Sequence, residues 1–312
     1  MLHITNGDST RMGLERSSVP GTFSSWGDIL YEGPTPPNVS TEEWRRVRVE
    51  YLASQFDNAD GIGMKYRLED EALQRWRDHD EVVFWFEHDL YDQLLLLRHF
   101  SWLGDQGPTS PTRFTFICGD TYLGLLKPDQ FPEVFERRRP ISGDHIWPAR
   151  RAWKAFCSDD PTARVPFAAA ASAELPYLPG AMRRHLEDFP SASNGLARSE
   201  AQILRILSEG TRTPEETFIE CQALEERIFM GDASFWTIVK RLAAGLHPLI
   251  TARVEEQRDR LPLGTLEITS TGRDVLAGRA DQVALNGLDR WMGGVRLTPS
   301  QCWRWTGTTL TR

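Results

Sequence analysis

Residues 81–97, EVVFWFEHDLYDQLLLL, constrain more than any other stretch what this chain can fold into. An unbroken run of β-branched and aromatic residues, 82–86, ends abruptly in an acid, a histidine and a second acid at 87–89. A run without polar alternation is typical of a strand that is covered on both faces. Residues 90–97 carry leucines at helical spacing, which indicates a helix returning along a sheet. The stretch therefore predicts a buried strand whose carboxyl end meets water.

Two other stretches end in the same way. Residues 2–8, LHITNGD, and residues 114–120, FTFICGD, are short apolar segments that each finish on an aspartate. Parallel strands bring their carboxyl ends to one edge of a sheet, and open α/β sheets bind ligands at that edge. We therefore expect the three strands to be neighbours, and Asp8, Asp89 and Asp120 to share one ligand or cation.

The expected fold class is α/β, with a mainly parallel Rossmann-like sheet, then a helical segment and a winged helix-turn-helix-like C-terminal domain. At 312 residues the chain is long enough for about two domains with cores of their own. The most linker-like segment, PSASNG, ends at Gly195. We place an α/β domain at 1–125, a helical connecting region at 126–195 and the winged-helix-like domain at 196–312.

The pattern after residue 196 predicts three helices followed by two paired strands, an order typical of a winged helix-turn-helix. Lys240 and Arg241 fall on the expected recognition helix, and Arg253, Arg258 and Arg260 fall on or near the wing. DNA is therefore a candidate partner, although a less favoured one than a small molecule. Residues from Ser191 onward hold 15 basic and 15 acidic side chains. Since counterion release needs excess positive charge, we expect DNA binding to be weak and lost with salt.

Shorter patterns predict the remaining elements. They are a helix from Arg11 to Arg16 capped by Asp8, Ser9 or Thr10, a strand at 22–30, helices at 41–55, 68–78, from 121, 148–156, 168–173, 178–189, from 199 to 210, 214–229 and 233–244, a loop at 142–145, and strands at 249–254 and 266–269.

Composition narrows the class of protein. The net charge of −8 argues against a surface that binds nucleic acid over the whole chain. The four cysteines lie far apart without a C-x-x-C pair, which disfavours a zinc knuckle or a disulfide framework and favours a reducing compartment. No apolar run approaches the roughly 18 residues that a membrane helix needs, and the N-terminus has no signal-peptide pattern. We expect a cytoplasmic protein without a membrane partner.

The triplet Gly7-Asp8-Ser9 after a strand resembles the nucleophile motif of the GDSL hydrolases. That family also needs an Asp-x-x-His motif, and no histidine here has an aspartate three residues before it. A cap at a helix N-terminus is the more frequent role of such a serine, although another histidine can serve a triad, which is defined by geometry. Neither G-x-G-x-x-G nor the P-loop motif occurs, so both common nucleotide fingerprints are missing.

Three ordered motifs, HITNGDS, WGDIL with EGP, and VVFWFEHDLYDQLLLL, resemble the bacterial domain of unknown function 1835 family over roughly the first 120 residues. LPGAMRRHLEDFPS, NGLARSE and DRWMGGVRL resemble segments that accompany this domain. The resemblance implies an α/β domain joined to a helical and winged-helix-like tail. It implies no catalytic residue, because no reaction is assigned to the family. The positions shared with it are His3, Asp8, Ser9, Asp28, Glu87, Asp89, Asp92 and Gln93.

Two functions remain open. The favoured one is a small-molecule or phosphate-ligand site at the strand edge, as in a metal-assisted hydrolase or transferase. Carboxylates from several strand ends suit Mg²⁺, which takes one or two carboxylates together with phosphate oxygens. The alternative is a ligand-sensing regulator that binds DNA through the winged helix. The catalytic candidates are Asp8, Ser9, His88 and Asp89, and the ligand-binding candidates are His3, Asn6, Gly7, Thr10, Asp28, Glu87, Asp92, Gln93 and Asp120.

Overall fold

A mixed, mostly parallel sheet lies in the first half of the protein, by which we mean residues 1–195; the second half is residues 196–312. The computed structural model describes residues 1–56, 59–106, 111–257 and 260–312. Within them the sheet has the strand order β2-β1-β4-β5-β6, parallel except for β6. This confirms an α/β fold with β1, β4 and β5 as neighbours. The strands are β1 (Leu2–Thr5), β2 (Thr22–Ser25), β4 (Glu81–Phe86), β5 (Arg113–Cys118) and β6 (Arg139–Pro140).

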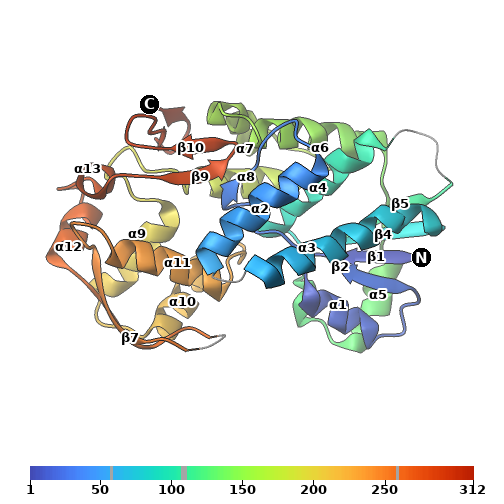
Figure 1. Ribbon diagram of the computed structural model, residues 1–312, viewed down its shortest axis with the longest axis horizontal. Coiled ribbons are helices and arrows are strands. Elements are labelled where there is room, and N and C mark those ends of the chain that lie inside the picture. Colours follow the sequence, from blue (N-terminus) through green and yellow to red (C-terminus); the bar gives the residue numbers. More distant parts are fainter. Residues whose placement is uncertain (57–58, 107–110, 258–259) are drawn as a thin grey trace.

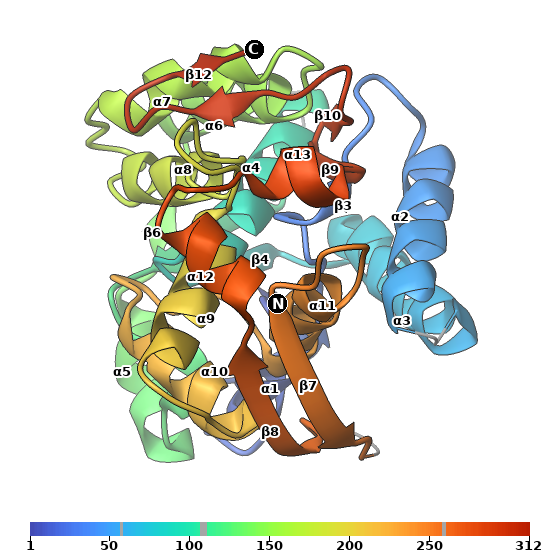
Figure 2. The same ribbon diagram turned by 90° about the vertical axis from the view of Figure 1, so that its left-hand side faces the viewer.

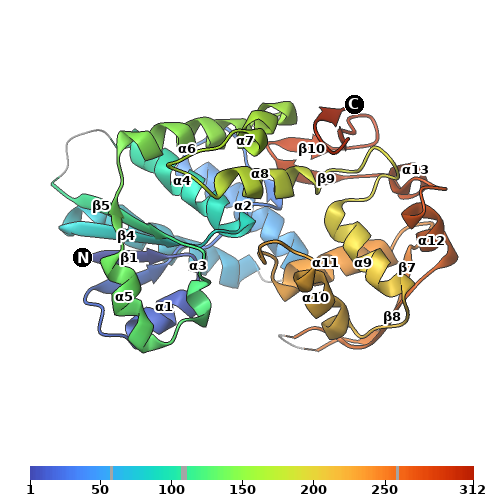
Figure 3. The same cartoon turned by 180° about the vertical axis from the view of Figure 1, so that it is seen from behind.

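Helices cover both faces of this sheet, as the apolar run of β4 requires (Figure 3). Val82, Phe84 and Phe86 pack in the core that holds α4 (Leu90–Asp105) and α6 (Gly143–Phe156). Val83 and Trp85 point to the other face, where they pack with residues of α1 (Asp8–Glu15) and α5 (Phe131–Glu136). Alternate residues of β4 therefore enter two different cores, which explains why the strand carries no polar alternation.

The rest of the first half is helical. Residues 41–56 form α2, whose buried positions include Trp44 and Leu52. The remaining elements here are α2 (Thr41–Phe56), α3 (Ala59–Gln74), α7 (Val165–Ala169), α8 (Leu178–Leu186), the short strand β3 (Gly33–Pro34) and the 3-10 turns η1 (Arg75–Asp78), η2 (Leu123–Leu125), η3 (Pro128–Gln130) and η4 (Pro161–Arg164).

Two predicted boundaries near the N-terminus are wrong. The helix after β1 begins at Asp8 with Gly7 as its N-cap, so Asp8, Ser9 and Thr10 lie inside its first turn and none caps it. The second strand ends at Ser25 instead of reaching residue 30. The segment that follows wraps around Arg48, whose guanidinium donates to the carbonyls of Ile29, Glu32 and Pro34.

Other predicted boundaries are also wrong. The expected loop at 142–145 is the start of α6, because Ser142 and His145 form a capping box in which Ser142 N donates to His145 Nδ1 at 3.1 Å. The helix expected from Thr121 is only η2, since Leu123 N donates to the Glu87 carboxylate instead of continuing a helix. The expected helices at 68–78 and 168–173 start earlier, and those at 178–189 and 214–229 end earlier.

A second hydrophobic core lies in the region after residue 196, and it occupies the other end of the molecule from the sheet (Figure 1). Three helices are followed by the antiparallel pair β7–β8, in the order expected. Arg258, expected near the wing, lies outside the described residues. The elements are α9 (Arg198–Ser208), α10 (Pro214–Ala223), α11 (Asp232–Ala243), β7 (Ile250–Glu255), β8 (Leu263–Ile268), α12 (Ser270–Leu276) and α13 (Gln282–Asn286).

The last strands return to the first core. β9 pairs with β3, Gly33 opposite Met292, and β9 is also paired with β10. Met292, Leu297 and Leu310 belong to the core that contains the sheet, and the final strands lie beside α7 (Figure 2). Residues 196–312, expected as one domain, thus contribute to both cores. The last strands are β9 (Arg290–Gly293), β10 (Val295–Leu297), β11 (Arg304–Trp305) and β12 (Leu310–Thr311).

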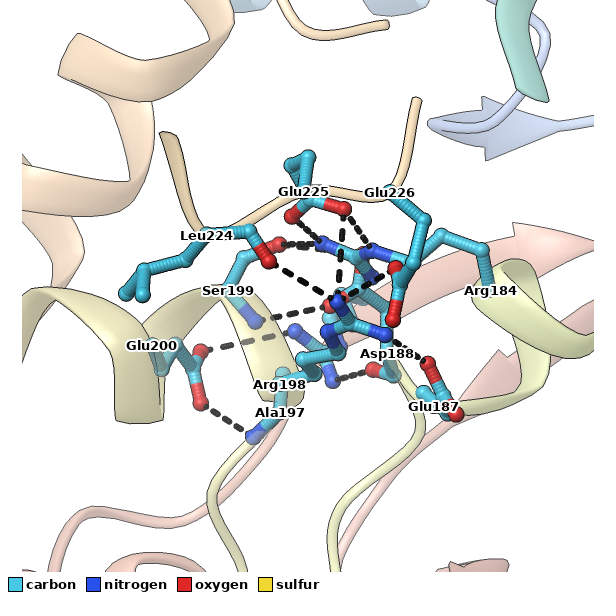
Figure 4. A network of polar contacts seen from close by, with 11 residues as sticks. Arg184, Glu187, Asp188, Ala197, Arg198, Ser199, Glu200, Leu224, Glu225 and Glu226 are labelled. Carbon is cyan, nitrogen blue, oxygen red and sulfur yellow. Dashed lines mark hydrogen bonds and ion pairs between the residues drawn. The ribbon is translucent and has the colours of Figure 1, made fainter. Parts of the chain in front are cut away.

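A network of ion pairs links the two halves (Figure 4). Arg184 of α8 is buried and binds Asp188 (3.0 Å) and Glu225 (2.8 Å), the latter from the segment between α10 and α11. Arg198, at the start of α9, binds Glu187 and Glu226, each at 2.7 Å. The Arg184–Glu225 pair is buried, and buried pairs depend strongly on both partners, so this pair fixes α8 against the second half.

Among the described residues, no helix has the length and apolar character needed to cross a bilayer. All four cysteines are free thiols.

Candidate site at the carboxyl edge of the sheet

Three buried carboxylates gather where β4 ends. Glu87, Asp89 and Asp92 each offer one oxygen, and these oxygens lie within 4.8 Å of one another. Glu87 and Asp89 fall on the same side of the chain because neighbours alternate in an extended segment. Asp89 is the N-cap of α4 and accepts a hydrogen bond from Asp92 N at 3.1 Å, which brings in the third carboxylate one helical turn later. Among the described residues this is the group with the spacing of a metal site.

Segments that follow β1, β4 and β5 all contact this group. From the β1 end, Asn6 Nδ2 donates to Asp92 Oδ2 at 2.9 Å, and Thr10 Oγ1 donates to Asn6 Oδ1 at 2.8 Å. From the β5 side, Leu123 N donates to Glu87 Oε1 at 2.7 Å. Asp92 Oδ1 accepts from Glu87 N at 2.8 Å. Neighbouring parallel strands therefore converge on one edge, as their topology requires.

Burial and mutual repulsion disfavour ionisation of the three acids. Burial, together with the nearby Glu87 carboxylate, raises the pKa of Asp89 to about 7, against a hydrogen bond from Asp92 N. Burial raises the pKa of Asp92 well above its usual range, with Asp89 and Glu87 adding to the effect. Burial also raises the pKa of Glu87. Three adjacent carboxylates need a proton or a cation to share the site.

The expected group of Asp8, Asp89 and Asp120 is not the one that forms. Asp8 lies in the first turn of α1, exposed, where it binds Arg11 (3.2 Å) and accepts from Ser25 Oγ (3.1 Å). Asp120 is exposed beyond the end of β5. Asp89 turns inward because its side chain caps α4, whereas Asp8 lies inside the first turn of α1 and pairs with Arg11.

Several other candidates have structural roles. His3 is fully buried, accepts from Trp85 Nε1 at 3.0 Å and contacts the carbonyl of Pro20 at 3.1 Å, so it belongs to the core. Asp28 is fully paired with Arg48 (2.7 Å). Gln93 Nε2 donates to the Glu87 carbonyl at 2.8 Å and supports the end of β4 from behind.

Ser9 does not form a triad, because it is exposed and makes no hydrogen bond to a histidine among the described residues. Gly7 has open space where a Cβ would stand, so the start of α1 is accessible there. No side chain caps this helix, which leaves the N–H groups of its first turn available to an anion.

The His88 ring, between Glu87 and Asp89 in the chain, packs against two tyrosines. It lies 4.8 Å from the ring of Tyr122 and 5.8 Å from that of Tyr177. The Arg227 guanidinium lies 5.1 Å from the Tyr177 ring. Burial lowers the pKa of His88, and Arg227 lowers it further, against Asp120. His88 is therefore neutral at pH 7, and its Nδ1 is buried without a hydrogen-bond partner in the described chain.

Another buried acid near this edge, Glu69, was not predicted from the sequence. Glu69 of α3 accepts from Ser25 Oγ (3.2 Å) and from Gly27 N (3.4 Å), and Lys65 Nζ lies 3.8 Å away. Burial raises its pKa to about 7, although Lys65 acts in the opposite direction. Glu69 shares a helical face with the buried Tyr66, three residues before it, and that spacing was the available signal.

The donor set fits a hard divalent cation. The three carboxylates supply oxygens only, which Mg²⁺ and Ca²⁺ take in preference to nitrogen or sulfur. Glu87, Asp89 and Asp92 would hold such an ion, and Asn6 would orient Asp92 as an outer partner. A cation would also relieve the repulsion that raises the pKa of these acids.

Comparison with known proteins adds no family or function. A scan against protein-family models gave no match. A search of curated proteins gave no match either. The resemblance to the domain of unknown function 1835 family stays a prediction from its three motifs.

Proposed function

We propose that the carboxyl edge of the sheet binds a divalent cation of the Mg²⁺ type together with a phosphate-bearing small molecule, as a metal-assisted hydrolase or transferase. The observation that carries this proposal is the buried group of Glu87, Asp89 and Asp92. Three buried carboxylates within contact of one another are costly unless charge is compensated. Oxygen-only donors favour hard cations such as Mg²⁺, Ca²⁺ and Mn²⁺ over softer metals.

The surroundings of the acids support a phosphate as the second component. The uncapped N-terminus of α1 presents backbone N–H groups beside Asn6, which itself contacts Asp92. Arg227 stands near His88 and makes no ion pair with the described residues. A bound Mg²⁺ neutralises phosphate charge and polarises phosphoryl oxygens. A neutral His88 suits proton acceptance from a nucleophile.

Metal titration of the Asp89→Asn variant tests this proposal. We expect the wild-type chain to bind Mg²⁺ or Mn²⁺ in calorimetry and the variant to bind at least about tenfold more weakly, as for lost ligands or their supports. Because burial raises the pKa of Asp89 to about 7, protons compete with the cation, and binding should be tighter at pH 8 than at pH 6.

Asp120→Asn is the matched control, because Asp120 is an exposed aspartate outside the acid group. It should bind metal as the wild type does. Equal metal binding by Asp89→Asn and wild type would show that the three acids share protons as a structural unit, and the proposal would then fail.

A DNA-binding regulator is the second candidate, supported by the order of three helices and a hairpin from α9 to β8. The position of α11 counts against it. Arg241 lines a cavity together with Glu32 and Tyr51, so this cation faces the first half of the chain. Lys240 lines another cavity with Gln55 of α2. If the full chain bound a DNA duplex with submicromolar affinity at physiological salt, the DNA-binding function would be favoured instead.

A further inference from the structure

A large groove lies over the helical layer, away from the candidate site. Residues of α4, α6, α7 and the loop at 36–39 line a cavity of about 1400 Å³. None of Glu87, Asp89 and Asp92 lines it. Sites for single small molecules usually occupy about 300–1,000 Å³. The groove therefore has room for a longer ligand than the carboxyl edge requires.

Positive charge dominates this groove although the chain carries −8 overall. Four cations line it against two carboxylates, Asp105 and Asp159. Asp105 is already bound by Arg150 at 2.7 Å. Arg151 and Lys154 are exposed and make no ion pair with the described residues. The free charge of the groove is positive, which attracts an anion.

Arg98, one of these four cations, has no counter-ion among the described residues. Its guanidinium lies 5.0 Å from the Trp44 ring and 5.9 Å from the Trp153 ring, and its Nε is buried without a hydrogen-bond partner. It makes no ion pair with the described residues and lines the groove. A half-buried cation without a counter-ion is costly, and an anion in the groove would offset that cost.

An aromatic ring completes the lining. Trp147 is 64% exposed, and the Arg150 guanidinium lies 5.6 Å from its ring. Trp147, Arg151 and Lys154 follow one another at spacings of four and three residues, so they share one face of α6. An aromatic platform beside a row of cations is the arrangement that binds unpaired bases and their phosphates.

We propose that this groove binds single-stranded nucleic acid. Trp147 stacks on a base, while Arg151, Lys154 and Arg98 contact successive phosphates. The volume and the spread of cations along α6 favour an oligonucleotide over a mononucleotide. This inference stands apart from the proposed metal site, since the two share no residue.

Fluorescence anisotropy with labelled oligonucleotides of about 4, 8 and 16 nucleotides tests the proposal on the full chain. We expect affinity to rise with length and to fall with salt with a logarithmic slope of about −2 for three free cations. Trp147→Ala should bind about tenfold more weakly. Parallel DNA and RNA series establish which polymer is preferred.

Two double variants with equal change in net charge locate the site. Arg151→Glu with Lys154→Glu should abolish binding, whereas Arg16→Glu with Arg205→Glu, two exposed cations outside the groove, should retain it. Circular dichroism confirms that each variant is folded. Equal loss in both double variants, no binding by any oligonucleotide at low salt, or equal affinity for a mononucleotide would each overturn the proposal.

Discussion

Burial controls the protonation of the acids at the sheet edge. Glu69 is only 3% exposed, and burial raises its pKa to about 7 from an ordinary value of 4.5. Its folded state therefore binds a proton more tightly than its unfolded state does. For an acid whose pKa is raised by folding, the stabilising effect is complete below the ordinary pKa and is lost as the pH rises through about 7.

Glu69→Gln should remove this pH dependence. The stability of the wild type relative to the variant should fall between about pH 4.5 and 8, by on the order of 3 kcal/mol, since one pKa unit corresponds to about 1.4 kcal/mol. His3, whose pKa burial lowers to about 4, acts in the opposite sense, but it is present in both proteins and cancels. Urea unfolding at several pH values measures the difference. Glu71→Gln, at an exposed position of the same helix, is the control, and an identical pH profile for the two variants would contradict the assignment.

At the scale of elements, α2 is held to the segment after β2 by buried ion pairs to Asp28, from Arg48 at 2.7 Å and from Arg45 at 3.7 Å. Arg48 and Asp28 have fully buried side chains, 2.7 Å apart, and Arg48 also donates to the Ile29, Glu32 and Pro34 carbonyls. Removing one partner of such a pair leaves an unpaired buried charge. This pair therefore holds the segment between β2 and β3 against α2, and the pairing of β3 with β9 holds its far end.

Arg48→Met should destabilise the protein by about 3–5 kcal/mol, because Asp28 loses its nearest buried counter-ion and keeps only Arg45, at 3.7 Å. Arg46→Met is the control on the same helix, since Arg46 pairs with Glu43 and Glu50 at the surface and such pairs contribute about 1 kcal/mol or less. Chemical denaturation followed by tryptophan fluorescence compares the two variants. A similar loss of unfolding free energy in both variants would show that the buried pair stabilises the protein no more than the surface pairs do.

The sequence predicts elements well where one local pattern is sufficient. The apolar run at 82–86 predicts a buried strand, and the run's end predicts where acids gather, because both follow from chain neighbours. No local pattern predicts that Arg48 is buried, and only the three-residue spacing from Tyr66 indicates Glu69, since a charged residue on a helix normally faces water and only distant partners reverse this. The same limit explains why Asp8 and Asp120 were expected to join Asp89 in one group, where the structure has Glu87 and Asp92; the position of Asp92 depends on the exact start of α4.

At the scale of the whole molecule, residues that follow the second core in the chain return to pack in the first core. The second core draws its residues from 196–285, yet Met292, Val295 and Leu297 pack in the first core, although residues 196–312 were expected to form one domain. Burying an aliphatic side chain contributes about 1.5–3 kcal/mol, so these strands are a sizeable part of the first core. The sheet should therefore depend on residues nearly 300 positions away from its first strand.

Leu297→Ala tests this dependence, because Leu297 is fully buried in the core that contains β4. We expect a loss of about 2–5 kcal/mol in the free energy of unfolding, as for other buried leucines. Hydrogen exchange should show faster opening of β4 amides, far away in sequence. Leu246→Ala, at a leucine that is 88% exposed, should change neither quantity. If Leu297→Ala weakened protection only after residue 196, the last strands would belong to the second half, and the first core would be independent of them.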